Sequence, residues 1–399
     1  MPGFSNLSEA LSESPIRRLL SIAEEVKSKG KKVISFSAGQ PGLPPAKELV
    51  EYLASFLRKE PYKASRYSPT EGFLSLRQAI SMDLEKYGGF SVQPDQILVT
   101  TGAAEGILLS FLALLNPGEQ VIVCDPTYVP YLQANKIVKA KVVTWPSSVE
   151  NGFQPDPEVF KELAGEKTKL VALVSPCNPT GRIISKDVLR TVLDLAEEKG
   201  FWVVFDEAYK HMVYEGEHVW AYKMDSSGSV LSINTFSKDP ALAGFRIGYV
   251  YGPKEAVQRM KKIKQFTTLC TSTISQVAAE YYLTSGIKEK YLKEVLPIYA
   301  KRRNELYQAL SKDLPELKAF KPPAGMFIFA DASYYLNQLG MDDYEFCLKL
   351  ARETGVFVVP GSAFGSRGKK HLRFSFVTEN GEKIREGVAR IKEFILSFS

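Results

Sequence analysis

Two charged residues follow apolar runs at the expected ends of strands. Asp206 follows the run 202–205, and Lys238 comes shortly after the run 230–233. An acid in the place of Asp206 caps a helix or pairs with the protonated ring nitrogen of a heteroaromatic electron sink. A lysine in the place of Lys238 is a solvated surface residue or an imine-forming amine whose pKa is lowered by Arg246, eight residues further on.

A third feature could bind a phosphate. The segment Thr101-Gly102-Ala103-Ala104 follows an expected strand and opens an expected helix, so its free N–H groups and the helix dipole could hold an anion. Turn chemistry alone is the commoner reason for a glycine in such a place. Hydroxyls of Thr235 and Ser237 and the guanidinium of Arg246 could complete a phosphate site without a metal ion.

Arg373 is the remaining charged residue in an apolar setting. It lies inside the stretch Leu372 to Phe376. A structural ion pair would explain this position. Bidentate recognition of a substrate carboxylate would also explain it, because a planar guanidinium suits that task better than a lysine.

The elements that must position these residues alternate between strands and helices. Apolar runs predict strands at 97–100, 120–124, 142–144, 170–174, 202–205, 230–233 and 247–250. Several runs are unbroken, which indicates a mostly parallel sheet covered on both faces. Ligands of such α/β sheets bind beyond the carboxyl ends of the strands, where most of the candidate residues lie.

The sequence pattern changes after the last strand of the expected sheet. The pattern predicts long helices at 276–283 and 289–310, and then a mixture of strands and helices at 326–330, 356–359, 372–376 and 381–396. Near the start it predicts a helix within 8–29 and a loop from Gly39 to Pro45. We expect a large α/β domain at 46–288 and a small α+β domain formed by 1–45 plus 289–399.

The composition is that of an ordinary globular protein. Of 399 residues, 45% are apolar and 24% charged, and the net charge is +6. The basic cluster Lys261, Lys262 and Lys264 is interpreted as a solvated helix face, because nucleic-acid binders carry longer basic stripes. Four scattered cysteines, three histidines and the lack of a long apolar window argue against disulfides, a metal site and a membrane span. We expect a cytoplasmic protein that binds small molecules.

The candidate residues also form an ordered pattern along the chain. The pattern consists of Gly39, Tyr67 with Gly72, Gly102-Ala103-Ala104, Tyr128, Asn178-Pro179-Thr180-Gly181, Asp206-Glu207-Ala208-Tyr209, Ser237-Lys238 with Arg246, and Arg373. It resembles the class I/II aminotransferases, which are fold-type-I enzymes dependent on pyridoxal 5'-phosphate. The resemblance covers about residues 15–395.

The resemblance implies roles for the residues around the cofactor ring. Lys238 would carry the internal aldimine and move the proton between the substrate's α-carbon and C4′ of the cofactor. Asp206 would keep the pyridine nitrogen protonated. Tyr209 and Asn178 would hydrogen-bond the phenolic oxygen, and Tyr128 would stack on the ring. We accordingly expect Lys238, Asp206 and Tyr209 to be the catalytic residues.

The resemblance also implies how the charged ends are held. Arg373, helped by Asn178 and the backbone at Gly39, would clamp the α-carboxylate of the substrate. The phosphate would be bound by the backbone of Ala103 and Ala104, by Thr235, Ser237 and Arg246, and by Tyr67 of a second subunit. This role for Tyr67 requires a homodimer with shared active sites.

Four positions depart from many relatives. Ala103 and Ala104 offer no hydroxyl, so only their backbone could bind phosphate, and Pro240 follows the lysine unusually closely. Tyr128 stands where some relatives have tryptophan. None of these changes the implied reaction class.

The substrate is less clearly indicated. Residues 66–72 are similar to the aminoadipate and aromatic branch, whereas 360–365 are similar to the aspartate and alanine branch. No motif selects Arg17, Arg18 or Lys63 as a partner for an acidic side chain. We expect aromatic or broad substrates with 2-oxoglutarate as the amino acceptor.

Two other functions remain open at this point. A pyridoxal-phosphate-dependent β-lyase would use the same residues to form the same carbanion and would differ only in the next step. A cofactor-binding transcription regulator would need a helix-turn-helix module, for which the residues before Gly39 are too few.

Overall fold

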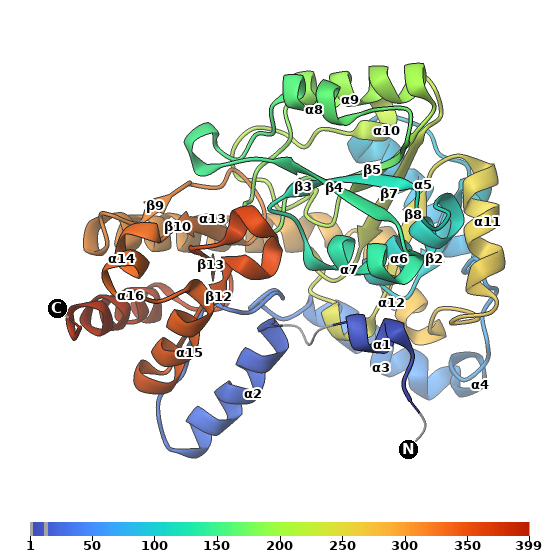
Figure 1. Ribbon diagram of the computed structural model, residues 1–399. Helices are drawn as coiled ribbons and strands as arrows, with labels where there is room; N and C mark the ends of the chain where they lie inside the picture. Colours follow the sequence, from blue (N-terminus) through green and yellow to red (C-terminus); the bar gives the residue numbers. More distant parts are fainter. Residues whose placement is uncertain (1–2, 12–14, 399) are drawn as a thin grey trace.

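The computed structural model describes residues 3–11 and 15–398, and its largest sheet has seven strands (Figure 1). The strands are β2 (Ile97–Thr100), β3 (Gln120–Asp125), β4 (Lys141–Pro146), β5 (Thr168–Val174), β6 (Trp202–Asp206), β7 (Val230–Thr235) and β8 (Gly248–Tyr251). Their order is β2-β8-β7-β6-β5-β3-β4, and β8 runs antiparallel to both neighbours while the other pairs are parallel. The predicted mostly parallel sheet is confirmed.

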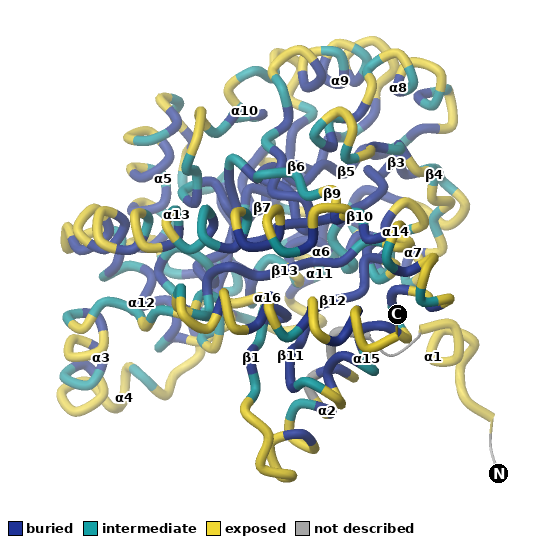
Figure 2. Tube along the Cα trace, turned by 90° about the vertical axis from the view of Figure 1, so that its left-hand side faces the viewer, coloured by how far each residue is buried: buried dark blue, intermediate teal, exposed yellow. Residues whose placement is uncertain are grey.

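Helices cover both faces of this sheet. Along β5, Leu170 and Ala172 point into one apolar layer and Val171 and Leu173 into the other, as the period of two requires. The first layer packs against α6 (Ala103–Leu114), α7 (Val129–Val138) and α11 (Lys254–Lys264). The second packs against α8 (Pro157–Leu163), α9 (Lys186–Lys199) and α10 (Ala221–Met224). Figure 2 shows the strands buried between helices whose outer sides are exposed.

A smaller antiparallel sheet lies beside the large one. Its order is β12-β13-β10-β9, formed by β9 (Lys318–Ala319), β10 (Phe327–Asp331), β12 (Val359–Pro360) and β13 (His371–Ser375). The helices of this region are α13 (Ile287–Asp313), α14 (Ser333–Gln338), α15 (Asp343–Thr354) and α16 (Gly381–Leu396). This mixture agrees with the α+β character expected for the C-terminal region.

The N-terminal segment joins this smaller region. β1 (Ile34–Ser35) pairs in parallel with β11 (Val356–Phe357). The single strand expected at 356–359 is therefore wrong: the chain changes partners at Val358, and β11 and β12 belong to different sheets. The helical pattern of 8–29 corresponds to α1 (Asn6–Ala10) and α2 (Pro15–Ser28), with residues 12–14 outside the described part. The domain boundaries at 46 and 288 stay a prediction.

The remaining helices pack against one another and against the edge strand β2. These are α3 (Lys47–Lys59), α4 (Pro61–Ala64), α5 (Leu74–Gly88) and α12 (Thr273–Thr284). Among all the helices described, none is both long and apolar enough to span a bilayer.

The lysine cluster on α11 corrects one expectation. Lys261 pairs with Glu71 at 3.0 Å, and Lys264 is fully buried with its Nζ 2.8 Å from Oε2 of Glu105. The prediction of a solvated helix face is wrong for Lys264, because the last turn of α11 packs against α6.

Candidate active site

A cavity of about 650 Å³ lies at the carboxyl ends of strands in the large sheet. All candidate residues except Tyr67 and Arg373 line it, namely Gly39, Ala103, Ala104, Tyr128, Asn178, Asp206, Tyr209, Thr235, Ser237, Lys238 and Arg246. They come from segments that are far apart in the sequence. The parallel strands bring them together because each ends at the same edge of the sheet.

Asp206 is the last residue of β6 and is almost fully buried. Its Oδ1 accepts from the backbone N–H of Ala208 at 3.0 Å, and its Oδ2 accepts from the hydroxyl of Tyr131 at 2.9 Å. Burial raises the pKa of Asp206 to about 6, against the opposing effects of these two donors and of the Lys238 charge. The carboxyl group is therefore held in a fixed orientation, and a cationic partner in the cavity would stabilise its ionised form.

Lys238 extends from the segment after β7 toward the opposite wall of the cavity. Its Nζ donates to the carbonyl oxygen of Gly39 at 2.7 Å and lies 5.2 Å from the ring centre of Tyr209. Burial, together with the nearby cations Arg373 and Arg246, lowers the pKa of Lys238 to about 8, against the opposing effect of Asp206. The sequence named only Arg246 for this effect, whereas Arg373 contributes more.

The N-terminus of α6 forms the third polar corner of the cavity. Gly102 caps the helix with φ +79°, and no side chain caps it. A Cβ at Gly102 would lie 2.7 Å from Nη2 of Arg246, so the glycine permits the guanidinium to approach the helix terminus. The hydroxyl oxygens of Thr235 and Ser237 lie 2.9 Å apart on the same wall. Free N–H groups, hydroxyls and a guanidinium together suit an anion.

Arg373 on β13 approaches the cavity from the smaller sheet. It lies behind Asn178, with Nη1 donating to Oδ1 of Asn178 at 3.1 Å and Nη2 donating to the carbonyl of Ser37 at 2.9 Å. The guanidinium lies 4.0 Å from the ring centre of Phe327, and burial lowers its pKa to about 10. Among the described residues the hydrogen-bond partners of Arg373 are Asn178 and Ser37, neither of them a carboxylate, and its buried Nε has no partner, so the ion-pair alternative is not supported.

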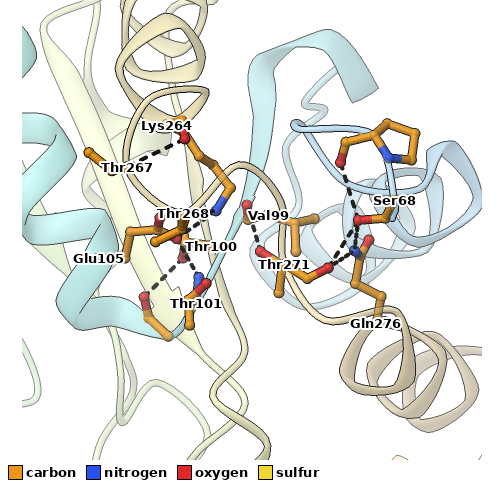
Figure 3. A network of polar contacts seen from close by, with 12 residues as sticks. Ser68, Val99, Thr100, Thr101, Glu105, Lys264, Thr267, Thr268, Thr271 and Gln276 are labelled. Atoms are coloured by element: carbon orange, nitrogen blue, oxygen red, sulfur yellow. Dashed lines mark hydrogen bonds and ion pairs between the residues drawn. The ribbon is translucent and has the colours of Figure 1, made fainter. Parts of the chain in front are cut away.

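Tyr67 lies away from the cavity and is 85% exposed. Its neighbour Ser68 donates to the carbonyl of Thr271 at 2.9 Å and accepts from Nε2 of Gln276 at 2.7 Å (Figure 3). Gly72, with φ +94°, leaves no room for a Cβ beside Val99. The exposed ring therefore projects from a segment that is fixed against the large sheet.

Some contributors were not identified from the sequence. Ser37 acts through its carbonyl, which leaves no trace in a side-chain pattern. Tyr131 is one of the buried residues of α7, and nothing in the sequence marks its hydroxyl as a partner of Asp206. Phe327 belongs to an apolar strand run. The wall also contains residues to which the sequence assigned no role, namely Ala38, Gln40, Val174, Ala208, Ala243 and Gly244.

Fold and cavity together define the class of protein. It is an α/β enzyme with a reactive amine, a buried acid and a helix N-terminus in one cavity at the carboxyl edge of a mostly parallel sheet.

Comparison with known proteins gives the family. The model of the family described as aminotransferase class I and II matches residues 31–391. The chain is 32% identical to the aspartate/prephenate aminotransferase of Thermus thermophilus, covering 98% of this chain and 99% of that one. It is 29% identical to aromatic-amino-acid aminotransferase 2 of Thermococcus litoralis, covering 97% of each chain. A solved double mutant of Thermus thermophilus aspartate aminotransferase superimposes with a TM-score of 0.91 at 30% identity, covering 98% and 100% of the two chains.

The chain therefore belongs to the class I and II aminotransferases. It is a fold-type-I, pyridoxal-phosphate-dependent aminotransferase, and the expected family and fold are confirmed. These relatives favour amino transfer over the β-lyase alternative.

The lowered pKa of Lys238 predicts the pH dependence of cofactor uptake if this amine is the one that reacts with the cofactor's aldehyde. Only the neutral amine can attack an aldehyde, so the rate of uptake should rise with pH and level off above about 8, instead of near the ordinary lysine value of 10.5. Stopped-flow absorbance at a series of pH values measures this. Arg373→Met should move the midpoint upward because it removes a cation, while Arg385→Met, at an exposed position on α16, should leave it in place. A wild-type midpoint near 10 would contradict the assignment.

Proposed function

We propose that this enzyme transfers the amino group of aromatic or a broad range of amino acids to 2-oxoglutarate, with Lys238 binding the cofactor covalently and moving the substrate's α-proton. The observation that carries the proposal is that Lys238, Asp206 and the N-terminus of α6 line one cavity, with Arg373 directly behind its wall. A base, an acid and two cationic ends are the groups that this reaction requires.

The phosphate of the cofactor would bind at the N-terminus of α6. The backbone N–H groups of Ala103 and Ala104 line the cavity there, and Gly102 lets Arg246 come close to them. Helix dipole and guanidinium both favour a dianion at this point. Thr235 and Ser237 would add hydroxyl donors. The fit holds although Ala103 and Ala104 have no side-chain donor.

Tyr128 and Asp206 would hold the ring of the cofactor, Tyr128 by stacking on it and Asp206 by pairing with its nitrogen. When bound, the cofactor supplies an electron sink for the electron pair left on the substrate's α-carbon. Asp206 would hold the ring nitrogen in its protonated form, because a cation beside a desolvated carboxylate favours the ionised acid. Tyr131 and the N–H of Ala208 keep the carboxylate turned toward the cavity. Tyr209 and Asn178, on the same walls, would donate to the phenolic oxygen.

Lys238 would serve as both anchor and base. A pKa of about 8 leaves part of its amine neutral near neutral pH, as covalent attachment needs. Once released by the substrate's amine, the same Nζ would take the proton from the α-carbon and return it to the cofactor side. Its present acceptor, the carbonyl of Gly39, lies on the wall that would receive the substrate.

Arg373 would bind the α-carboxylate of the substrate. Its guanidinium is fixed by Asn178, by the carbonyl of Ser37 and by the ring of Phe327. A bidentate contact from such a fixed fork would orient the α-hydrogen relative to Lys238.

The charge of the cavity supports a neutral or aromatic side chain on the donor. Among the described residues, Lys238 and Arg246 are the basic groups on the cavity wall, and both would be engaged by the cofactor. Arg18 and Lys63 are exposed and do not line the cavity, and the side chain of Arg17 lies outside what is described. The names of the relatives, which include aspartate, prephenate and aromatic amino acids, agree with a broad range.

A homodimer is part of the proposal. Ser68 Oγ donates to the carbonyl of Thr271 at 2.9 Å, so the segment of Tyr67 lies beside the segment between α11 and α12. Both segments carry strongly exposed aromatic rings, Tyr67 at 85% and Phe266 at 90%. Such a patch is typical of a surface covered by a second subunit, from which Tyr67 would reach the partner's phosphate.

Absorbance spectroscopy tests the function directly. The loaded enzyme should show the visible band of bound cofactor, which bleaches with its amino-acid donors and returns on adding 2-oxoglutarate. A panel of phenylalanine, tyrosine, leucine, 2-aminoadipate, aspartate and alanine ranks the donors, and we expect the aromatic ones to bleach it fastest. Lys238→Ala should abolish turnover, because base and anchor are lost, while Lys262→Ala at an exposed site retains it. Normal turnover by Lys238→Ala would refute the mechanism.

Arg373→Ala should raise the KM for every amino acid by about 100-fold, because two charge-assisted hydrogen bonds to the carboxylate are lost. Steady-state kinetics on three donors measures this, with Arg385→Ala as a matched surface control. An unchanged KM across the donors would remove Arg373 from the substrate site.

The proposed dimer predicts that the Tyr67→Phe substitution weakens cofactor binding in the partner subunit. The variant should remain dimeric but bind pyridoxal phosphate more weakly, by about 5-fold for one lost hydrogen bond. Sedimentation velocity and cofactor titration check the two parts. Tyr62→Phe, also strongly exposed, serves as the control. A fully active monomer would contradict the shared site.

A further inference from the structure

A carboxylate lies at the helix terminus that would receive the cofactor's phosphate. Glu105 is the third residue of α6, directly after Ala103 and Ala104, and its Oε2 accepts from the backbone N–H of Thr101 at 2.5 Å. This bond fixes the turn from β2 into α6. The same carboxylate is buried and brings negative charge close to the place where a dianion would bind.

Lys264 compensates the negative charge of Glu105. It comes from the last turn of α11, its side chain is fully buried, and its Nζ lies 3.0 and 2.8 Å from the two oxygens of Glu105. Thr268 accepts from Nζ of Lys264 at 2.8 Å and donates to Glu105. Figure 3 shows Lys264, Thr268 and Thr101 converging on the one carboxylate.

The hydrogen bond that fixes the turn does not by itself require a charged pair. The bond to the N–H of Thr101 needs only a carbonyl-type oxygen, which a glutamine would supply without burying two charges. Because the two charges cancel, removing only one partner would leave a net charge beside the terminus of α6. Removal of Lys264 alone would leave an uncompensated buried carboxylate beside the first turn of α6.

We propose that Lys264 is a positioning residue of the cofactor site, which neutralises Glu105 so that this carboxylate can fix the first turn of α6 without repelling the phosphate. The inference rests on the proposed binding of the phosphate at Ala103 and Ala104. It assigns a task to the one member of the α11 lysine cluster that is fully buried.

Titrations of the apoprotein with two probes test the inference. Pyridoxal phosphate and pyridoxal differ only in the phosphate, so the ratio of their dissociation constants isolates the phosphate contribution. Lys264→Met should weaken pyridoxal phosphate by about 10-fold and leave pyridoxal unchanged, because only the dianion meets the unpaired charge. Lys264→Met combined with Glu105→Gln should restore the wild-type ratio. Arg303→Met, which breaks a remote ion pair with Glu215, should keep that ratio whatever it does to stability.

The outcomes separate this inference from the proposed function. A wild-type protein that binds pyridoxal as tightly as pyridoxal phosphate would refute the phosphate site itself. If the wild type prefers pyridoxal phosphate and Lys264→Met keeps the same preference, the role of Lys264 alone is refuted. The same holds if Lys264→Met weakens the binding of both probes equally. If a urea titration shows that Lys264→Met is not folded, the Glu105→Gln variant tests the inference instead. It should bind pyridoxal phosphate at least as tightly as the wild type, and weaker binding would overturn the inference.

Discussion

Several charged groups are buried around one cavity, and the cost of removing them from water constrains the rest of the structure. Asp206 is held by a tyrosine hydroxyl and a backbone N–H, Lys238 by a backbone carbonyl, and Arg373 by Asn178 and a second carbonyl. Except for the N–H of Ala208, each partner comes from a segment far along the chain from the residue it holds. The cavity can therefore exist only when the sheets and the N-terminal segment are assembled together.

The architecture divides the proposed chemistry between its two main sheets. The parallel strands of the large sheet end at one edge, which places Asp206, the segment of Lys238 and the terminus of α6 around one volume. The smaller sheet contributes Arg373 from β13. A substrate held at both places would lie between the sheets, so the geometry of the proposed reaction depends on how they pack.

Charge compensation extends beyond the cavity wall. The buried pair of Glu105 and Lys264 joins the first turn of α6 to the end of α11, and the chain continues from there to the exposed ring of Phe266. The segment that carries Tyr67 lies against the same region through Ser68 and Thr271. In this arrangement the proposed phosphate site and the proposed subunit interface share one set of supporting elements.

The sequence by itself determined the fold class, the strands of the large sheet and most of the cavity lining, because apolar periodicity and the residues after each strand are local signals. Only the tertiary structure decided that Tyr131 and the carbonyl of Ser37 serve Asp206 and Arg373, that 356–359 is divided between two sheets, and that Lys264 is buried. The physical reason is that these features depend on contacts between distant segments. Periodicity reports which face of an element is apolar, but not which polar groups another element brings to it.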